Sequence, residues 1–256
     1  MDKMLRTLLI ITITFFNFQS LQADALVEHI CPFSVDTQLS YDVEVASSLI
    51  KKDLCTLDEI DAQVIQRILN QEVLTKLIES DKKQVLQFVM IAYIPAAPDL
   101  IANLLFNTES LDQLLPSTDH LSLLDINNMD ELKTSYPDFA LIHSDIDFTN
   151  SQIYQAKSTY GEGLFRIVDH LVKHAMLIKS DASISLYANL IESDKIFKSA
   201  FNMFKLIPYA DGTILVSYSS DNIKHRQAPL FMDKIKSSAM KSFTQFVLDM
   251  KKMLGV

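Results

Sequence analysis

The stretch from Val85 to Pro116 constrains the fold more than any other part of the chain. It opens with VLQFVMIAYI (85–94), ten residues of which only Gln87 is strongly polar. This run is too short to cross a bilayer and too rich in β-branched and aromatic side chains to favour a helix. It predicts a strand that is packed on both faces or that follows a curved sheet.

The second half of this stretch predicts two short helices. Prolines at 95 and 98 end the strand, because proline cannot donate a hydrogen bond to a sheet. Apolar residues then recur at helical spacing between Leu100 and Leu105, and a second apolar turn spans Leu111 to Leu115. This order predicts a sheet that curves around another element, with small helices closing the gap.

Composition excludes one class of partner. The 256 residues carry a formal net charge of −9, and no basic stripe offsets it. Nucleic-acid binding needs clustered lysine and arginine, so we expect no nucleic-acid partner.

The N-terminus has the pattern of a secretion signal. Lys3 and Arg6 precede the apolar run LLIITITFF (8–16), and polar residues and then Leu21-Gln22-Ala23, with a small residue at the cleavage site, follow. We expect residues 1–23 to be a signal peptide cleaved after Ala23, with Ala25 as a second candidate and an uncleaved membrane anchor as the alternative. No later segment is long and apolar enough to span a membrane. The expectation is a soluble secreted or periplasmic protein whose oligomeric state the sequence leaves open.

Two cysteines, Cys31 and Cys55, lie in the N-terminal part of the expected mature chain. In an oxidising compartment they are candidates for a disulfide, and two unpaired thiols are the alternative. They lack the accompanying histidine spacing of a zinc site. We predict no metal and no cofactor.

The region 24–70 is expected to be a helical extension. One helix is predicted near 43–50. A second is predicted to begin at Thr56, with Glu59 completing a capping box, and to end near Asn70. A strand at 72–79 would then form an antiparallel hairpin with the strand at 85–94.

Beyond Pro116 the pattern favours an antiparallel meander. We predict a strand at 120–126, a polar loop at 127–135 and an alternating segment at 139–148. The segment 165–179 is interpreted as a strand, although its apolar spacing also fits a helix. Strands at 201–209 and 213–218 flank Ala210-Asp211-Gly212, which is typical of a hairpin turn. After Pro229 an apolar stripe continues to Leu254 and predicts a long helix lying across a concave sheet.

Three segments resemble one known family. The segment 94–116 (IPAAPDLIANLLFNTESLDQLLP) resembles the first long strand, Ala-Pro turn and paired helices of the START-like superfamily, also called SRPBCC or the polyketide cyclase and Bet v 1-like helix-grip fold. The segment 201–219 (FNMFKLIPYADGTILVSYS) is similar to its penultimate hairpin, and 230–254 to its closing helix. The resemblance covers 72–254, while 127–181 departs from the pattern and holds an insertion or an irregular strand.

The resemblance implies an α+β fold, with a curved antiparallel sheet wrapped around a long C-terminal helix at 71–256. It also implies a cavity between sheet and helix that binds a lipid or another hydrophobic small molecule. A cyclase- or hydrolase-like enzyme and a cell-envelope interaction module with a collapsed core are the alternatives, and we favour a non-enzymatic role. The candidate lining residues are Phe88, Met90, Leu104, Leu115, Tyr187, Phe204, Phe231, Met240, Phe243, Phe246 and Met250.

The sequence gives little support for a catalytic or metal site. His143, Asp145 and Asp147 alternate and would share one face of a strand, which we interpret as a solvated edge rather than a metal or acid–base cluster. His170 and His174 also share a face, and two surface histidines are favoured over a zinc site because a third ligand is not evident. An enzyme would have only Tyr154, His170 and Tyr187 as polar candidates, so we assign no catalytic residue.

Overall fold

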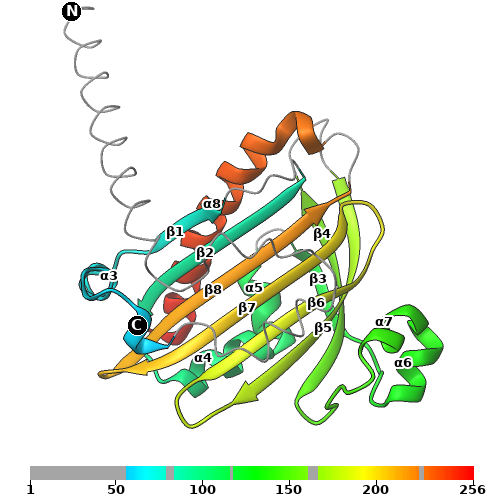
Figure 1. The fold of residues 1–256 in the computed structure, drawn as a ribbon, viewed down its shortest axis with the longest axis horizontal. Coiled ribbons are helices and arrows are strands. Elements are labelled where there is room, and N and C mark those ends of the chain that lie inside the picture. Colours follow the sequence, from blue (N-terminus) through cyan, green and yellow to red (C-terminus); the bar gives the residue numbers. More distant parts are fainter. Residues whose placement is uncertain (1–55, 79–83, 116–117, 161–166, 225–227) are drawn as a thin grey trace, which may run out of the picture.

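A curved antiparallel sheet forms the body of the molecule (Figure 1). The computed structural model describes residues 56–78, 84–115, 118–160, 167–224 and 228–256. Within these ranges the sheet has eight strands in the order β1-β2-β8-β7-β6-β5-β4-β3. The strands are β1 (Leu74–Ile78), β2 (Val85–Ile94), β3 (Thr118–Leu123), β4 (Ser151–Tyr160), β5 (Ile167–Lys179), β6 (Ile184–Ser193), β7 (Phe197–Tyr209) and β8 (Gly212–Ile223).

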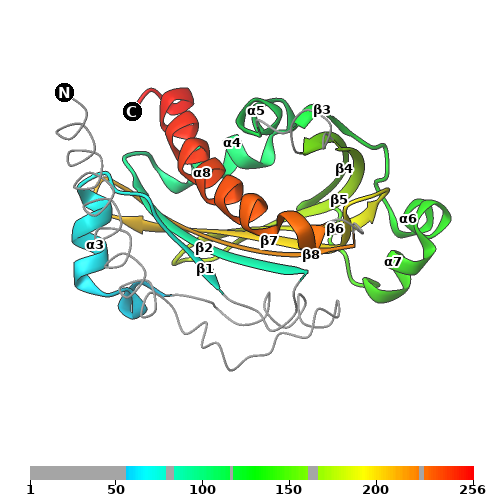
Figure 2. The same ribbon diagram turned by 90° about the horizontal axis from the view of Figure 1, so that it is seen from above.

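Helices lie on both faces of the sheet. The long helix α8 crosses the concave face, with α4 and α5 beside it on the same side (Figure 2). The others pack at the outer face or the sheet edge. The helical elements are the 3-10 turn η1 (Leu57–Glu59), α3 (Ala62–Leu69), α4 (Pro98–Phe106), α5 (Thr108–Leu114), α6 (Met129–Ser135), α7 (Pro137–Ile142) and α8 (Ala228–Leu254).

Strand β2 is buried along its whole length, as its apolar sequence predicts. Successive side chains of a strand point to opposite faces. Met90 and Ile94 therefore join the cluster under α8, whereas Ile91 and Tyr93 join the cluster that packs against α3. The predicted hairpin of β1 and β2 is confirmed, with Leu74 opposite Ile91.

The predicted hairpin of β7 and β8 is also confirmed, and its turn explains a glycine. Ala210 adopts a positive φ of 51°. A Cβ on Gly212 would lie 2.5 Å from the carbonyl oxygen of Ile94, so only glycine fits this close approach of two backbones. Next to it, the buried Thr213 hydroxyl donates to the carbonyl of Ala96 at 2.6 Å, which ties β8 to the turn after β2.

The start of the chain's first described helix differs from its prediction. The backbone N–H of Thr56 does donate to Glu59 at 2.7 Å, as the capping box requires. However, this turn is the isolated η1, and α3 begins separately at Ala62 with Asp61 as its N-cap. The predicted end of this helix near Asn70 is confirmed, since Asn70 is the C-cap of α3. The helix predicted at 43–50 lies outside the described residues, as do Cys31, Cys55 and the signal peptide.

Two predictions between β3 and β4 are wrong. The expected polar loop at 127–135 contains α6, because the side chain of Asn128 accepts hydrogen bonds from two backbone N–H groups and caps the helix. The alternating segment at 139–148 begins as α7, which packs Phe139 and Ala140 into a cluster on the outer face with Ile153. The insertion expected within 127–181 is therefore α6 and α7. β4 and β5 are strands, and the register of β5 with β6 shifts between Val172 and Lys173.

Candidate functional site

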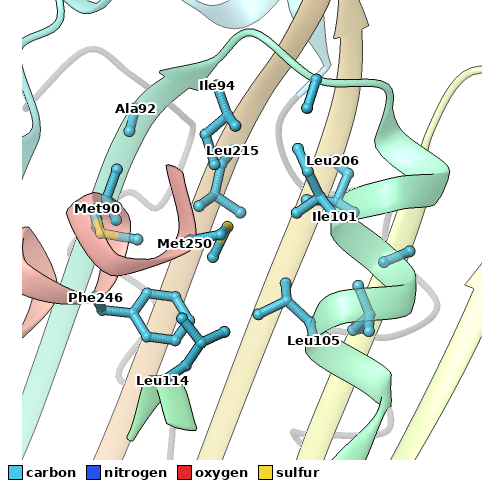
Figure 3. Packing of buried hydrophobic residues seen from close by; sticks show 14 of the residues in the cluster. Met90, Ala92, Ile94, Ile101, Leu105, Leu114, Leu206, Leu215, Phe246 and Met250 are labelled. Carbon is cyan, nitrogen blue, oxygen red and sulfur yellow. The ribbon is translucent and has the colours of Figure 1, made fainter. Parts of the chain in front are cut away.

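The concave face of the sheet and the inner face of α8 share one apolar surface. Figure 3 shows Met90, Ala92 and Ile94 of β2 converging with Phe246 and Met250 of α8. Ile101 and Leu105 of α4 close the same cluster from the side (Figure 3). The sheet therefore packs on α8 through apolar side chains of β2 and α8, and Met90, Phe246 and Met250 among them are predicted lining residues.

Most of the predicted lining residues gather at this surface. Met90, Phe246 and Met250 are buried in the main cluster, and Leu104, Leu115, Phe204 and Phe243 are partly buried against it. Phe88 and Met240 belong to the adjoining cluster that shares Phe243. Large apolar side chains that stay partly exposed on an inner surface are the ones a hydrophobic ligand would contact.

Aromatic pairs connect the sheet to the helix at two points. The rings of Phe204 and Phe246 stack with centroids 5.6 Å apart, and the ring of Phe88 meets that of Phe243 at 5.4 Å. Both distances lie in the range of favourable aromatic contact. The helix is thus anchored over β2 and β7.

One predicted lining residue lies elsewhere, and another cannot be placed. Leu186 of β6 faces α8, so its neighbour Tyr187 faces the opposite side. There the ring of Tyr187 lies 6.2 Å from that of Phe201. Phe231 falls within α8, but its side chain is outside the described residues.

A chain of polar side chains crosses the same concave face. The ammonium of Lys173 on β5 donates to Asn202 Oδ1 on β7 at 3.5 Å. Asn202 Nδ2 donates to the hydroxyl of Ser219 on β8 at 2.8 Å, and Ser219 donates to Asp221 Oδ2 at 3.3 Å. We call these four residues the polar relay. Each member of the polar relay lies an even number of residues from an apolar residue of the concave face on the same strand, so the two share a face. These apolar residues are Leu177 on β5, Phe204 on β7 and Leu215 on β8.

Burial shapes the electrostatics of both ends of the polar relay. Burial lowers the pKa of the Lys173 ammonium, and the nearby Asp221 opposes this effect. Burial raises the pKa of Asp221 to about 6, against the opposing influence of Lys173 and the Ser219 hydrogen bond. Both groups are therefore poorly solvated charges that stabilise each other across the sheet.

A tyrosine stands beside the cationic end of the polar relay. Tyr154 on β4 is directly opposite Lys173 on β5. Its side chain is 4% exposed and packs with Leu171 and Ala175 on the concave face. Burial raises the pKa of its hydroxyl well above the usual range, so this hydroxyl stays protonated and is a hydrogen-bond donor.

Comparison with known proteins rests on structure, since no protein-family model matches the chain and no curated protein matches it in sequence. The STAR-related lipid transfer protein from Xanthomonas axonopodis is 12% identical, covers 70% of this chain and 93% of its own, and has a TM-score of 0.52. The chain has the START-like fold. The chain is also similar to a START superfamily protein from Mycobacterium smegmatis, which is 10% identical, covers 66% of this chain and 98% of its own, and has a TM-score of 0.47. It is similar as well to the Zhui aromatase/cyclase from Streptomyces, which is 9% identical, covers 66% of this chain and 94% of its own, and has a TM-score of 0.46.

The histidines of the chain do not form the clusters considered from sequence. His143 follows α7 instead of lying on a strand, so it does not alternate with Asp145 and Asp147 on one face. His143 is also buried, which excludes the solvated edge that we expected. Burial lowers its pKa, and the nearby Asp145 opposes this.

His170 and His174 do share the outer face of β5, but they differ in burial. His170 is exposed, whereas His174 is 4% exposed, so the prediction of two surface histidines is right for the first and wrong for the second. His170 and Tyr187 face outward and Tyr154 faces inward, so the three enzymatic candidates do not meet. Across the described residues, no group of three or more His, Cys, Asp or Glu side chains is arranged to hold a metal ion.

Sequence reasoning missed the polar relay. Ser217, Ser219 and Asp221 alternate in β8 with the same parity as Leu215, and this pattern is visible in the sequence. Their position facing α8 required the register of β8 with β2, where Met90 pairs with Ser217.

None of the helices in the described ranges has the length and apolar character needed to cross a membrane.

Proposed function

We propose that this chain binds a hydrophobic small molecule, such as a lipid, between its sheet and α8, and that it acts as a carrier. The observation that supports this most is the partly exposed apolar surface on the concave side. Leu104, Leu115, Phe204 and Phe243 retain exposed area although they face a continuous core. A filled core would bury side chains of this size.

Small side chains at the centre of the concave face support the same proposal. Ala188 of β6 is opposite Ala175 on one side and Asn202 on the other, and it lies on the concave face. It is only half-buried although it lies on a central strand. Short side chains under a helix leave room that a ligand can occupy.

We also propose that the chain is exported and that residues 1–23 are removed after Ala23. Lys3 and Arg6 before the apolar run 8–16 support this, because they form the charged and apolar regions of a signal peptide. The carrier would then act on ligands available outside the cytoplasm.

Native mass spectrometry tests the proposal. The protein is expressed with its full N-terminus in a Gram-negative host and purified from the periplasm without delipidation. We expect a polypeptide mass that begins at Asp24, with additional peaks for bound lipid that disappear on denaturation. Ala188→Phe should reduce the bound fraction while keeping the circular dichroism spectrum, since the ring would fill the space above β6.

The matched control is Ala182→Phe, which places the same ring at an exposed turn. It should keep the bound fraction of the original protein. A single unliganded mass for the original protein, together with no uptake of added phospholipid, would refute the carrier function. Full-length polypeptide as the only product would refute the cleavage.

A further inference from the structure

The cationic end of the polar relay has unused hydrogen-bonding capacity. A lysine ammonium has three donors. Among the described residues, that of Lys173 has one hydrogen-bond acceptor, Asn202 Oδ1, at the long distance of 3.5 Å. A buried donor without an acceptor is unfavourable, so a ligand that supplies acceptors here gains binding energy.

Tyr154 adds a second donor on the neighbouring strand β4. It is directly opposite Lys173 in the pairing of β4 and β5, and side chains directly opposite each other in a sheet are within contact distance. Its hydroxyl has no hydrogen-bond acceptor in the part of the chain that the structure describes. An oxygen-rich head group lying between the two side chains would accept from both.

The charges near this point select the head group. Lys173 contributes one positive charge, and Asp221 contributes one negative charge at the other end of the polar relay. A doubly charged phosphate would place excess negative charge near Asp221 in a poorly solvated region. A singly charged carboxylate is matched by Lys173 alone and accepts two hydrogen bonds with its two oxygens.

We propose that Lys173 and Tyr154 bind the carboxylate of a fatty-acid-like amphiphile whose chain lies along the apolar surface under α8. Asn202, Ser219 and Asp221 are positioning residues, since they hold the ammonium on the concave face without contacting the ligand. The apolar side chains of Phe204 and Phe243 stand on the same face and contact the hydrocarbon chain. This assignment rests on the proposed function and narrows it to an acidic ligand.

A pair of ligands that differ only in the head group tests this proposal. Palmitic acid and cetyl alcohol have the same hydrocarbon chain, so their affinities separate head-group binding from apolar binding. The unmodified protein should bind the acid at least about tenfold more tightly, as a charge-assisted hydrogen bond contributes about 1.5–3 kcal/mol. NMR of carboxyl-labelled palmitate should also show a lowered pKa of the bound ligand, because the ammonium favours its ionised form.

Lys173→Met keeps the length of the side chain and removes its charge. It should bind the two ligands with similar affinity and return the palmitate pKa toward its value in a neutral apolar site. The control is Lys157→Met on β4, where the lysine is exposed on the other face, and it should keep the preference for the acid. Tyr154→Phe removes one hydroxyl only, and it should reduce the preference even if Lys173→Met does not fold.

The outcomes separate the two proposals. If the unmodified protein binds neither ligand, the carrier function itself is wrong. If it binds both equally, or if the preference for the acid survives both Lys173→Met and Tyr154→Phe, the carboxylate site is wrong while the carrier function stands.

Discussion

Replacement of His174 by leucine should remove an acid-sensitive element from the fold. His174 lies on the outer face of β5, 4% exposed, and its ring centroid is 5.8 Å from that of Phe139 on α7. Neither of its ring nitrogens has a hydrogen-bond partner among the described residues. Its pKa is lowered from 6.5 to about 4, mainly because burial disfavours the charged form and also because of electrostatic repulsion from His143.

The sign and size of the effect follow from proton linkage. In the unfolded chain His174 takes up its proton near pH 6.5, whereas in the folded chain it does so only near pH 4. The unfolded state therefore binds more protons between these values, and the stability present above pH 6.5 is lost as the pH falls toward 4. At ~1.4 kcal/mol per pH unit this loss amounts to ~3 kcal/mol.

Urea unfolding followed by circular dichroism at a series of pH values measures this loss. The free energy of unfolding of His174→Leu should fall by ~3 kcal/mol less than that of the unmodified protein between pH 6.5 and 4. At neutral pH the variant should be as stable or slightly more stable, because two buried nitrogens without partners are replaced by apolar atoms.

The control is His170→Leu, four residues away on the same strand but exposed. It should follow the unmodified protein through the whole pH series. Equal losses for His174→Leu and the unmodified protein would refute the reasoning, because they would show that His174 titrates alike in the folded and unfolded chains.

Two further substitutions test the packing that places the site. Phe246→Ala removes a ring that is 6% exposed between α8 and the sheet, and it should lower the free energy of unfolding by about 3–5 kcal/mol. The control is Leu248→Ala on the same helix, where the side chain is 50% exposed, and it should change the free energy of unfolding by less than about 1 kcal/mol. Similar values for the two would mean that α8 is not held by its inner face. Gly212→Ala should lower the melting temperature, since its Cβ would meet the carbonyl oxygen of Ile94 at 2.5 Å and overpacking is unfavourable by about 1–3 kcal/mol. An unchanged melting temperature would contradict the close approach of the two strands.

Local patterns in the sequence were sufficient for the elements that surround the site. The unbroken apolar run of β2, the Asp-Gly turn between β7 and β8 and the apolar stripe of α8 each predict their element. Each pattern reports burial on one or two faces of a single element, so it can be interpreted without the fold. The order of these elements resembles that of the helix-grip fold, and this resemblance implied the architecture.

Short segments whose conformation depends on neighbours were predicted poorly. The alternation at 139–148 favours a strand on its own, yet Pro137 begins a helix there and the packing of Phe139 on the sheet stabilises it. The burial of His174 likewise comes from α6 and α7 covering β5, and a histidine in a strand pattern carries no sign of such a cover. Tertiary packing outweighs weak local preference in both cases.

The run from Val85 to Ile94 by itself determined that the sheet is covered on both faces, because ten nearly uninterrupted apolar side chains have to be removed from water on both sides of the strand. Only the tertiary structure decided which polar side chains share the concave face with the apolar surface. Lys173, Asn202, Ser219 and Asp221 come from three strands, and the pairing register of those strands sets the face of each side chain. A shift of one residue in that register would turn any of them to the other side, and no single strand specifies its register alone.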